Sequence, residues 1–291
     1  MGKTKALIFG VSGQDGFYLS SLLEREGIEV IGSSRSQGVL GDVGDLDFVQ
    51  SLIQIHKPEY IFHFAAESST RHSVLFQNHS SISTGTINIL ESCRIYSPSS
   101  RIFLSGSAMQ FQNNGDPIDE KTPFSATSPY SISRIHSTYT GRYYREKFGM
   151  KIFTGFLFNH DSPLRSEDHI NQKIAKTIKR IKSGEDIKLE VGSPQVKKEF
   201  NFAGDIVEAI WALVNQDSIF ECVIGCGISY SIMEWIETCF SILNMDWKEH
   251  TIILDGFNPE YNSLVSRPFL IKETGWVPKT SFFELAKKMM E

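Results

Sequence analysis

The sequence predicts an α/β fold built on a parallel sheet that carries helices on both faces. Short apolar runs alternate with longer segments of helical periodicity through the first half of the chain. A glycine-rich turn joins the first apolar run to the first helical segment. Hydrophobic residues make up 41% of the 291 residues and charged residues 22%, which is typical of a globular protein with a sizeable core. In such a doubly wound sheet, ligands bind at the carboxyl ends of the strands.

Each expected strand is a short apolar run bounded by glycine or polar residues, and each expected helix has apolar residues at helical spacing. We expect strands at residues 6–9, 29–32, 60–64, 101–105, 152–158 and 220–224. We expect helices at residues 16–26, 45–56, 82–96, 129–148, 168–183, 205–215, 231–243 and 282–290. No Pro/Ser-rich linker interrupts the chain, so any second lobe should pack directly onto the first.

Charge and composition exclude several classes of function. With 29 Lys and Arg against 34 Asp and Glu, the net charge of −5 disfavours nucleic acid and anionic membranes as partners. No apolar run approaches the roughly 18 residues that span a bilayer, and the run near the start is too short for a secretory signal. The four cysteines form no CxxC pair, and no histidines have metal-ligand spacing. We therefore expect a cytoplasmic protein without a metal site.

The first chemical signal is the turn Gly10-Val-Ser-Gly13-Gln-Asp-Gly16, between the first strand and the first helix. Glycines here permit a tight turn and let the backbone approach a pyrophosphate. The start of the helix also offers unpaired N–H groups to phosphate oxygens. The turn therefore predicts a dinucleotide site.

The second signal concerns the choice of dinucleotide. NAD-selective folds usually have an acidic residue at the end of the second strand. Here residues 30–36 read VIGSSRS, which contains no acid but offers Arg35 and three serines to a 2′-phosphate. This pattern favours NADP, with NAD as the alternative.

The third signal is a serine, a tyrosine and an arginine that follow the glycine turn in chain order. Ser107 comes just after the fourth strand, and Tyr130 and Arg134 are four residues apart on one helix face. A free phenol has a pKa near 10, and a neighbouring cation lowers the pKa of a phenol. Tyr130 is therefore expected to exchange a proton with a substrate hydroxyl while hydride moves to or from a nicotinamide, and Ser107 would hold the same oxygen.

These features resemble the extended short-chain dehydrogenases/reductases that act on nucleotide sugars, and most of all the GDP-mannose 4,6-dehydratase family. The similar segments are residues 10–16 (GVSGQDG), 63–68 (HFAAES), 128–134 (SPYSISR), 157–163 (LFNHDSP), 198–211 (KEFNFAGDIVEAIW) and 275–285 (GWVPKTSFFEL). The resemblance implies a Rossmann-type domain with a smaller, interleaved C-terminal α/β substrate domain. The first would cover residues 1–165 and about 198–228, and the second 166–197 and 229–291. It also implies a homodimer through the helices at 82–96 and 129–148.

The resemblance also assigns roles to residues. The catalytic residues would be Ser107, Tyr130 and Arg134. The cofactor would be bound by Gly10, Gly13, Gln14, Asp15, Gly16, Arg35, Asp42, Val43, Ala65, Ala66, Tyr130, Arg134 and His160. The nucleotide-sugar substrate would be bound by Ser68, Asn159, Lys173, Lys198 and Arg267.

Four departures from the family pattern bear on the chemistry. Arg134 stands where the family has lysine, and a guanidinium is bulkier and planar. Met109 stands where the dehydratases have a glutamate, and a thioether moves no protons. Glu67 replaces a glutamine near the expected sugar site. The late Arg-Pro segment of the family reads Asn258-Pro259 here, so a diphosphate or ribose contact is either missing or supplied by Arg267.

Three functions follow from these matches and departures. The leading hypothesis is hydride transfer at C4 of a GDP-linked hexose or heptose, giving C4 oxidation, 4-keto reduction or epimerisation. The alternative is a 4,6-dehydratase in which Glu67 replaces the missing glutamate as a catalytic residue. A third reading, motivated by Arg134 and Met109, is a catalytically degenerate protein that binds the sugar nucleotide without turnover.

Overall fold

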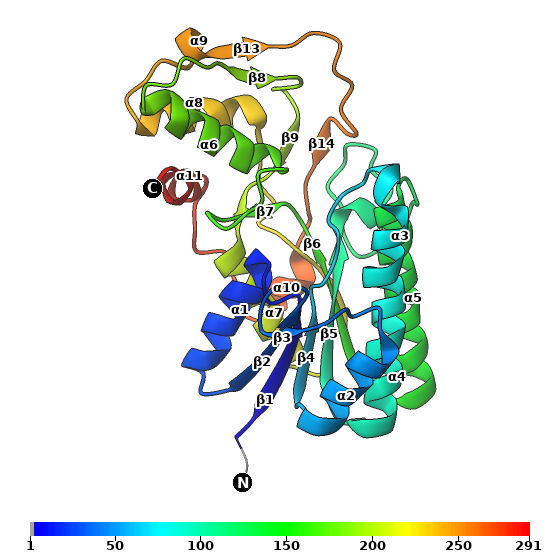
Figure 1. Cartoon of the computed structure of the whole chain (residues 1–291). Helices are drawn as coiled ribbons and strands as arrows, with labels where there is room; N and C mark the ends of the chain where they lie inside the picture. Colours follow the sequence, from blue (N-terminus) through cyan, green and yellow to red (C-terminus); the bar gives the residue numbers. More distant parts are fainter. Residues whose placement is uncertain (1–2) are drawn as a thin grey trace.

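A seven-stranded sheet forms the centre of the molecule, as seen in a computed structural model that describes residues 3–291. The strand order is β11-β6-β5-β4-β1-β2-β3, and every neighbouring pair is parallel (Figure 1). The strands are β1 (Lys5–Phe9), β2 (Glu29–Ser34), β3 (Val39–Leu40), β4 (Tyr60–His63), β5 (Arg101–Ser107), β6 (Lys151–Leu157) and β11 (Glu221–Ile224). The chain winds outward from β1 in both directions, which confirms the predicted doubly wound parallel sheet.

All six strands expected from apolar runs occur, with small shifts at their ends. The central strands β5 and β6 are each buried at six of seven positions, which explains why they read as continuous apolar runs. β5 continues beyond the expected residue 105 because its backbone pairs with β6 as far as Ser107 and Leu157. Ser107 therefore ends its strand at the edge of the sheet where ligands bind.

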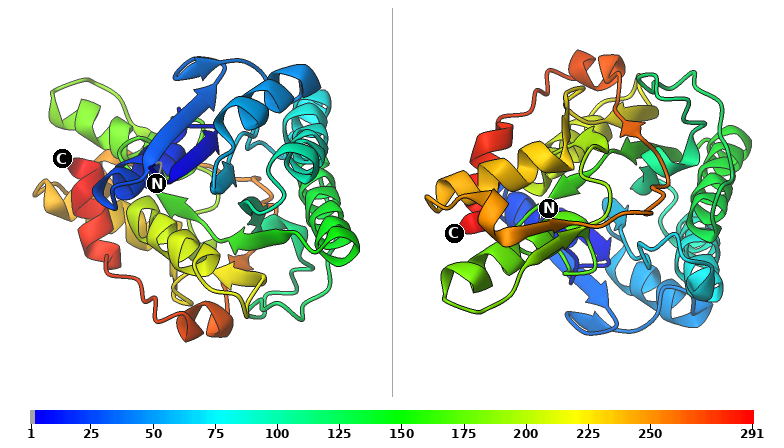
Figure 2. Two further views of the ribbon diagram at one scale, coloured as in Figure 1. Left: turned by 90° about the horizontal axis from the view of Figure 1, so that it is seen from below. Right: turned by 90° about the horizontal axis from the view of Figure 1, so that it is seen from above.

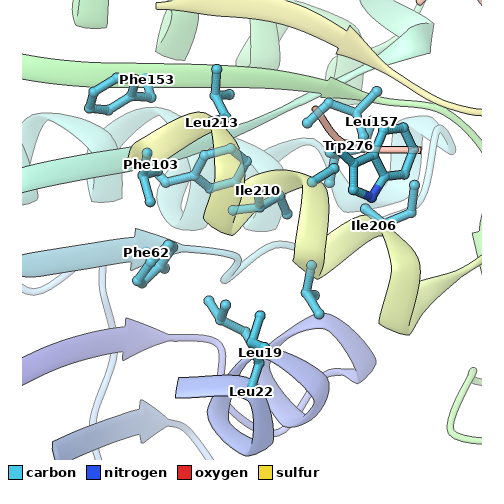
Figure 3. Close-up of a cluster of buried hydrophobic side chains, with 14 of the residues drawn as sticks. Leu19, Leu22, Phe62, Phe103, Phe153, Leu157, Ile206, Ile210, Leu213 and Trp276 are labelled. Atoms are coloured by element: carbon cyan, nitrogen blue, oxygen red, sulfur yellow. The ribbon is translucent and has the colours of Figure 1, made fainter. Parts of the chain in front are cut away.

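Helices cover both faces of the sheet (Figure 2). One face carries α1 (Gln14–Arg25) and α7 (Ala203–Val214), and the other carries α2 (Leu46–His56), α4 (Gly85–Tyr96) and α5 (Pro129–Phe148). Figure 3 shows the first of these layers, where Leu19 of α1 and Ile210 of α7 point toward Phe62 and Phe103 of the sheet. Each such side chain contributes about 1.5–3 kcal/mol by leaving water.

Local sequence signals fix the position of α5. Ser128 accepts a hydrogen bond from the backbone N–H of Ser131, and the Ser131 hydroxyl oxygen accepts one from the Ser128 N–H. Pro129 occupies the first turn, and the helix ends at Gly149, whose φ of +67° suits glycine. The observed bounds equal the predicted 129–148. Tyr130 is therefore held in the first turn of α5.

The segment before α4 differs from the expected single helix at 82–96. It consists of a 3₁₀ turn (His72–Val74), the short helix α3 (Leu75–Asn78) and a π-helical stretch (His79–Thr84) that runs into α4. Periodicity in the sequence cannot distinguish such a wider turn from an α-helix. The start of α4 packs closely on its neighbours, because a Cβ at Gly85 would lie 2.9 Å from Cγ1 of Val43 and 3.4 Å from Cε1 of His63 on β4.

A second group of helices packs around its own apolar cluster at the carboxyl end of the sheet. It contains α6 (Ile170–Lys182), α8 (Ile232–Ile242) and α11 (Phe282–Met290), with the fully buried Trp235 in the cluster. The remaining short elements are β7 (His160–Asp161), β8 (Leu189–Val191), β9 (Lys197–Glu199), β10 (Asn201–Phe202), β12 (Ser229–Ser231), α9 (Trp247–His250), β13 (Thr251–Ile253), β14 (Ser263–Leu264) and α10 (Phe269–Glu273). The strands among them have two or three residues each, too few for an alternating pattern to be visible in the sequence.

The C-terminal part of the chain returns to the first layer before it reaches α11. Ile271 of α10 and the following Trp276 are buried in the cluster formed with α1 and α7. We expected a dinucleotide-binding domain of residues 1–165 with about 198–228, and a substrate domain of residues 166–197 with 229–291. This division into two domains stays a prediction. No helix within residues 3–291 is long and apolar enough to cross a membrane.

Candidate active site

Two cavities lie at the carboxyl ends of the central strands, with volumes of about 530 Å³ and 340 Å³. We call them the first and the second cavity. Gly10, Gly13, Phe64 and Ala66 line both, so the cavities adjoin across the end of β1. Of the predicted site residues, the first cavity is lined by Gly10, Gly13, Arg35, Asp42, Val43, Ala65, Ala66 and Glu67. The second is lined by Gly10, Gly13, Gln14, Asp15, Gly16, Ala66, Ser68, Ser107, Tyr130, Arg134, Asn159 and His160.

The glycine turn has the geometry of a phosphate cradle. Gly10 has a φ of +93°, and a Cβ there would lie 2.6 Å from the backbone nitrogen of Ala65. A Cβ at Gly16 would lie 2.5 Å from the carbonyl oxygen of Gly10. Gly13 precedes α1 and provides no side-chain cap, so the first N–H groups of the helix remain available to an anion. The turn therefore fits the diphosphate of a dinucleotide.

The first cavity has the residues expected around an adenosine. Arg35 follows β2 and is exposed, and Asp42 and the buried Val43 lie on the opposite wall. Glu67 also lines this cavity and is absent from the described lining of the second. Its chain neighbours Ala66 and Ser68 line the second cavity, which contains Tyr130.

Ser107 is fixed by a buried polar chain at the end of β5. Its backbone N–H donates to Oε1 of Gln110 over 2.7 Å, and Nε2 of Gln110 donates to the Thr138 hydroxyl of α5 over 3.0 Å. The Ser107 Oγ accepts the Met109 N–H over 3.2 Å, so its hydroxyl proton remains available to a ligand. Gln110 was not singled out in the sequence, although it ties Ser107 to the helix that carries Tyr130.

Arg134 lies directly beside Tyr130, as the four-residue spacing predicted. Its Cζ is 5.1 Å from the centre of the Tyr130 ring, and only 4% of Arg134 is exposed. Its Nη1 donates to the carbonyl oxygen and the hydroxyl oxygen of Ser105 on β5. Ser107, Tyr130 and Arg134 thus face one cavity, together with Met109.

A buried ion pair links the glycine turn to β7. The Nε2 of His160 lies 3.0 and 3.2 Å from the Asp15 carboxylate oxygens, and its Nδ1 lies 2.8 Å from the Phe158 carbonyl oxygen. Both ring nitrogens therefore face acceptors, which favours the doubly protonated ring. Burial alone would lower the pKa of His160, but the Asp15 carboxylate outweighs it and raises that pKa. Burial would likewise raise the pKa of Asp15, and His160 lowers it.

Three of the predicted substrate residues are not among the described residues that line either cavity. Lys173 is exposed on α6 and borders a separate surface hollow. Arg267 is exposed, with its Nη1 4.0 Å from Asp119. Lys198 is buried on β9, where burial lowers the pKa of its ammonium to about 8 although Asp161 opposes the shift. Asn159, by contrast, lines the second cavity as predicted.

The second cavity also contains ionisable residues that were not picked out in the sequence. Arg165 and His169 follow β7, and burial together with the charge of Arg165 lowers the pKa of His169 to about 4. Arg165 stands two residues after the segment LFNHDSP, which could have drawn attention to it. Glu260 reaches the cavity from the loop before β14. No motif around Glu260 in the sequence indicates that it lies at the cavity.

Comparisons with known proteins agree with this geometry. The family model described as GDP-mannose 4,6 dehydratase matches residues 7–289. GDP-mannose 4,6 dehydratase 1 of Arabidopsis thaliana is 30% identical over 319 residues, which cover 98% of this chain and 88% of the relative. A GDP-mannose 4,6-dehydratase of Vibrio cholerae is 29% identical over 263 residues, covering 81% and 71%.

Solved structures share the fold at lower sequence identity. RMD from Pseudomonas aeruginosa, solved with NADPH, has a TM-score of 0.88 and 18% identity, covering 99% of this chain and 96% of that chain. UDP-glucose 4-epimerase of Thermus thermophilus, solved with NAD, has a TM-score of 0.86 and 20% identity, covering 99% and 98%. The arrangement of sheet and lobes is therefore common to these chains.

Proposed function

Because the chain belongs to the GDP-mannose 4,6-dehydratase family, we propose that it is an NAD(P)-dependent enzyme that transfers hydride at C4 of a GDP-linked hexose or heptose. The observation that carries this proposal is the shared lining of the second cavity. Ser107, Tyr130 and Arg134 face the same space as the glycine turn. A phenol, a hydroxyl and a cation beside a dinucleotide cradle are the groups that alcohol–ketone interconversion needs.

The residues support defined roles in this reaction. A bound nicotinamide would supply the acceptor or donor of hydride. In the oxidising direction the C4–H bond breaks as hydride leaves, while Tyr130 takes the proton of the C4 hydroxyl. Ser107 donates a hydrogen bond to the same oxygen through its free hydroxyl proton, and Arg134 places its positive charge over the phenol ring, 5.1 Å from the ring centre. In the reducing direction Tyr130 returns the proton to the oxygen.

NADP is the cofactor that the first cavity favours. Arg35 lines that cavity at the end of β2, where a 2′-phosphate would be recognised. Structural neighbours were solved with NADPH and with NAD, so they support a nicotinamide cofactor and leave the choice to this chain's own residues. Fluorescence titration with NADPH and NADH tests it, and tighter binding of NADH would contradict the preference.

The 4,6-dehydratase remains the second candidate because the family relatives carry that name. Dehydration requires a group that removes the C5 proton, and Met109 in the second cavity cannot do this. Glu67 lines the first cavity, whereas Tyr130 lines the second. The geometry therefore favours C4 chemistry without loss of water.

The deciding experiment follows the product of GDP-mannose in deuterated water by NMR. C4 redox chemistry predicts a product that keeps its C6 hydroxyl. A 4-keto-6-deoxy product that carries solvent deuterium at C5, with the hydride from C4 returned to C6, would establish the dehydratase instead. If NADPH and GDP-mannose bind but no nucleotide sugar is converted, the protein is a binding paralogue and the enzymatic proposal fails.

We also propose that the chain forms a homodimer through α4 and α5. These helices run side by side along one flank of the molecule (Figure 2). Their outer faces expose large apolar side chains, among them Ile95, Ile132 and Tyr143 at 50%, 52% and 55%. Light scattering after size-exclusion chromatography should give twice the 32.9 kDa of one chain, and Ile132→Arg should give the monomer mass.

A further inference from the structure

The guanidinium of Arg134 is anchored on strand β5. Its Nη1 donates to the backbone carbonyl oxygen of Ser105 and, over 2.7 Å, to the Ser105 hydroxyl oxygen. Arg134 is 4% exposed and Ser105 is 5% exposed, so water does not replace these bonds readily. The guanidinium therefore points to the sheet through Nη1, and its Cζ lies over the Tyr130 ring, 5.1 Å from the ring centre.

The hydroxyl of Ser105 is oriented by a second strand. It donates over 2.9 Å to the backbone carbonyl oxygen of His63, at the end of β4. A serine has one hydroxyl proton, so the remaining lone pairs of Ser105 Oγ face Arg134 as acceptors. The hydroxyl thus connects the ends of β4 and β5 to the cation on α5.

The neighbouring His63 does not supply a second positive charge beside Arg134. His63 is 1% exposed, and its two ring nitrogens have no hydrogen-bond partner among residues 3–291. Burial, together with the charge of Arg134, lowers the pKa of His63 to about 3, so the imidazole stays neutral near neutral pH. The acidic group that acts on Arg134 through charge is Asp15, whose carboxylate is already bound to His160.

We propose that Ser105 is a positioning residue that adapts the site to an arginine, by holding the guanidinium of Arg134 over the ring of Tyr130. This inference rests on the proposed function. A guanidinium has a rigid, planar fork of donors, so the partners of one nitrogen determine where the whole plane lies. An ammonium has three rotatable donors on a flexible stem and does not need such an anchor. The benefit of the Ser105 hydroxyl should therefore depend on which cation occupies position 134.

The test compares wild type, S105A, R134K and S105A/R134K in the conversion of the nucleotide sugar. Because a hydrogen bond to a charged group is lost, S105A should lower kcat about tenfold, with KM changed less than about twofold. The pH profile of kcat should move to higher pH, since the cation beside Tyr130 is less well placed. In the R134K background, S105A should cost less than about twofold in kcat, so the two substitutions are coupled.

A matched control, S100A, removes a serine hydrogen bond just before the first residue of β5. Ser100 is buried and donates over 2.6 Å to the carbonyl oxygen of Pro58, far from both cavities. S100A should lower thermal stability about as much as S105A while leaving kcat and its pH profile unchanged. Equal effects of S105A in both backgrounds, or an unchanged kcat in S105A, would overturn the proposal.

Crystal structures of wild type and S105A give a readout that does not need turnover. In S105A the guanidinium should leave its position against the Tyr130 ring, and in S105A/R134K the ammonium position should match that of R134K. An unmoved guanidinium in S105A would overturn the positioning role even if no substrate were found. Absence of turnover in wild type, with the guanidinium displaced in S105A, would count against the proposed function alone.

Discussion

The ion pair between Asp15 and His160 offers the sharpest test of the site's electrostatics, through the substitution Asp15→Asn. The two side chains are 18% and 10% exposed, and the carboxylate oxygens lie 3.0 and 3.2 Å from Nε2. Charge-assisted hydrogen bonds of this kind contribute about 1.5–3 kcal/mol. We expect D15N to lower the free energy of unfolding by about 2 kcal/mol near pH 5.5, or the melting temperature by about 5 °C.

The pKa shifts of His160 and Asp15 determine how the stabilisation by this ion pair changes with pH. The pKa of His160 is raised above 6.5, so its contribution is complete below pH 6.5 and is lost as the pH rises through the folded-state pKa. The pKa of Asp15 is lowered from 3.8, so its contribution is present above pH 3.8 and is lost as the pH falls through the folded-state value. The difference between wild type and D15N should therefore be largest between about pH 4 and 6.5, and should shrink toward pH 9.

Urea unfolding at pH 5.5, 7.5 and 9 measures this difference. Asp217→Asn is the matched control, because Asp217 is 64% exposed and its partners are Arg101 and Lys151, which stay charged over this range. D217N should therefore show no change in its effect between pH 5.5 and 9. A difference between wild type and D15N that is the same at all three pH values would refute the assignment of a charged His160.

Four further predictions concern ligand binding, stability and turnover. Gly13→Ala should fold normally, because its Cβ would lie 3.5 Å from the Gly10 carbonyl oxygen, yet weaken NADPH binding at least about tenfold in a fluorescence titration. Gly16→Ala, whose Cβ would lie 2.5 Å from the same oxygen, should instead lower the melting temperature. Arg35→Ala should raise the Kd of NADPH about tenfold and leave that of NADH within about twofold, which competition between the two measures. Glu67→Gln should keep kcat within about twofold, whereas abolished turnover would support the dehydratase alternative.

The sequence predicted those parts of the site that local chemistry determines. Within the glycine turn, Gly10 has a positive φ and Gly16 leaves no room for a Cβ beside Gly10, and α5 is specified by a serine cap and a proline at its start. The four-residue spacing of Tyr130 and Arg134 fixed their common helix face. The continuous apolar runs gave the central strands because those strands are buried on both faces.

The remaining contacts join residues that are distant in the chain. Asp15 and His160 are 145 residues apart, and Ser105 and Arg134 are 29 apart. No periodicity relates such positions, because the meeting depends on how loops leave the ends of the strands. Glu67 is a similar case. Its position just after β4 could be predicted from the sequence, but the cavity that it lines could not.

The two central departures from the family pattern have different consequences. The cation at position 134 is retained as arginine, and the structure supplies it with an anchor on Ser105 and a ring to stack on. The carboxylate missing at position 109 has no such substitute at the end of β5. Among the described residues of the second cavity, the carboxylates are Asp15, which is bound to His160, and Glu260, which comes from an exposed loop. A base that removes the C5 proton must be free and close to Tyr130, so hydride transfer is retained more readily than dehydration.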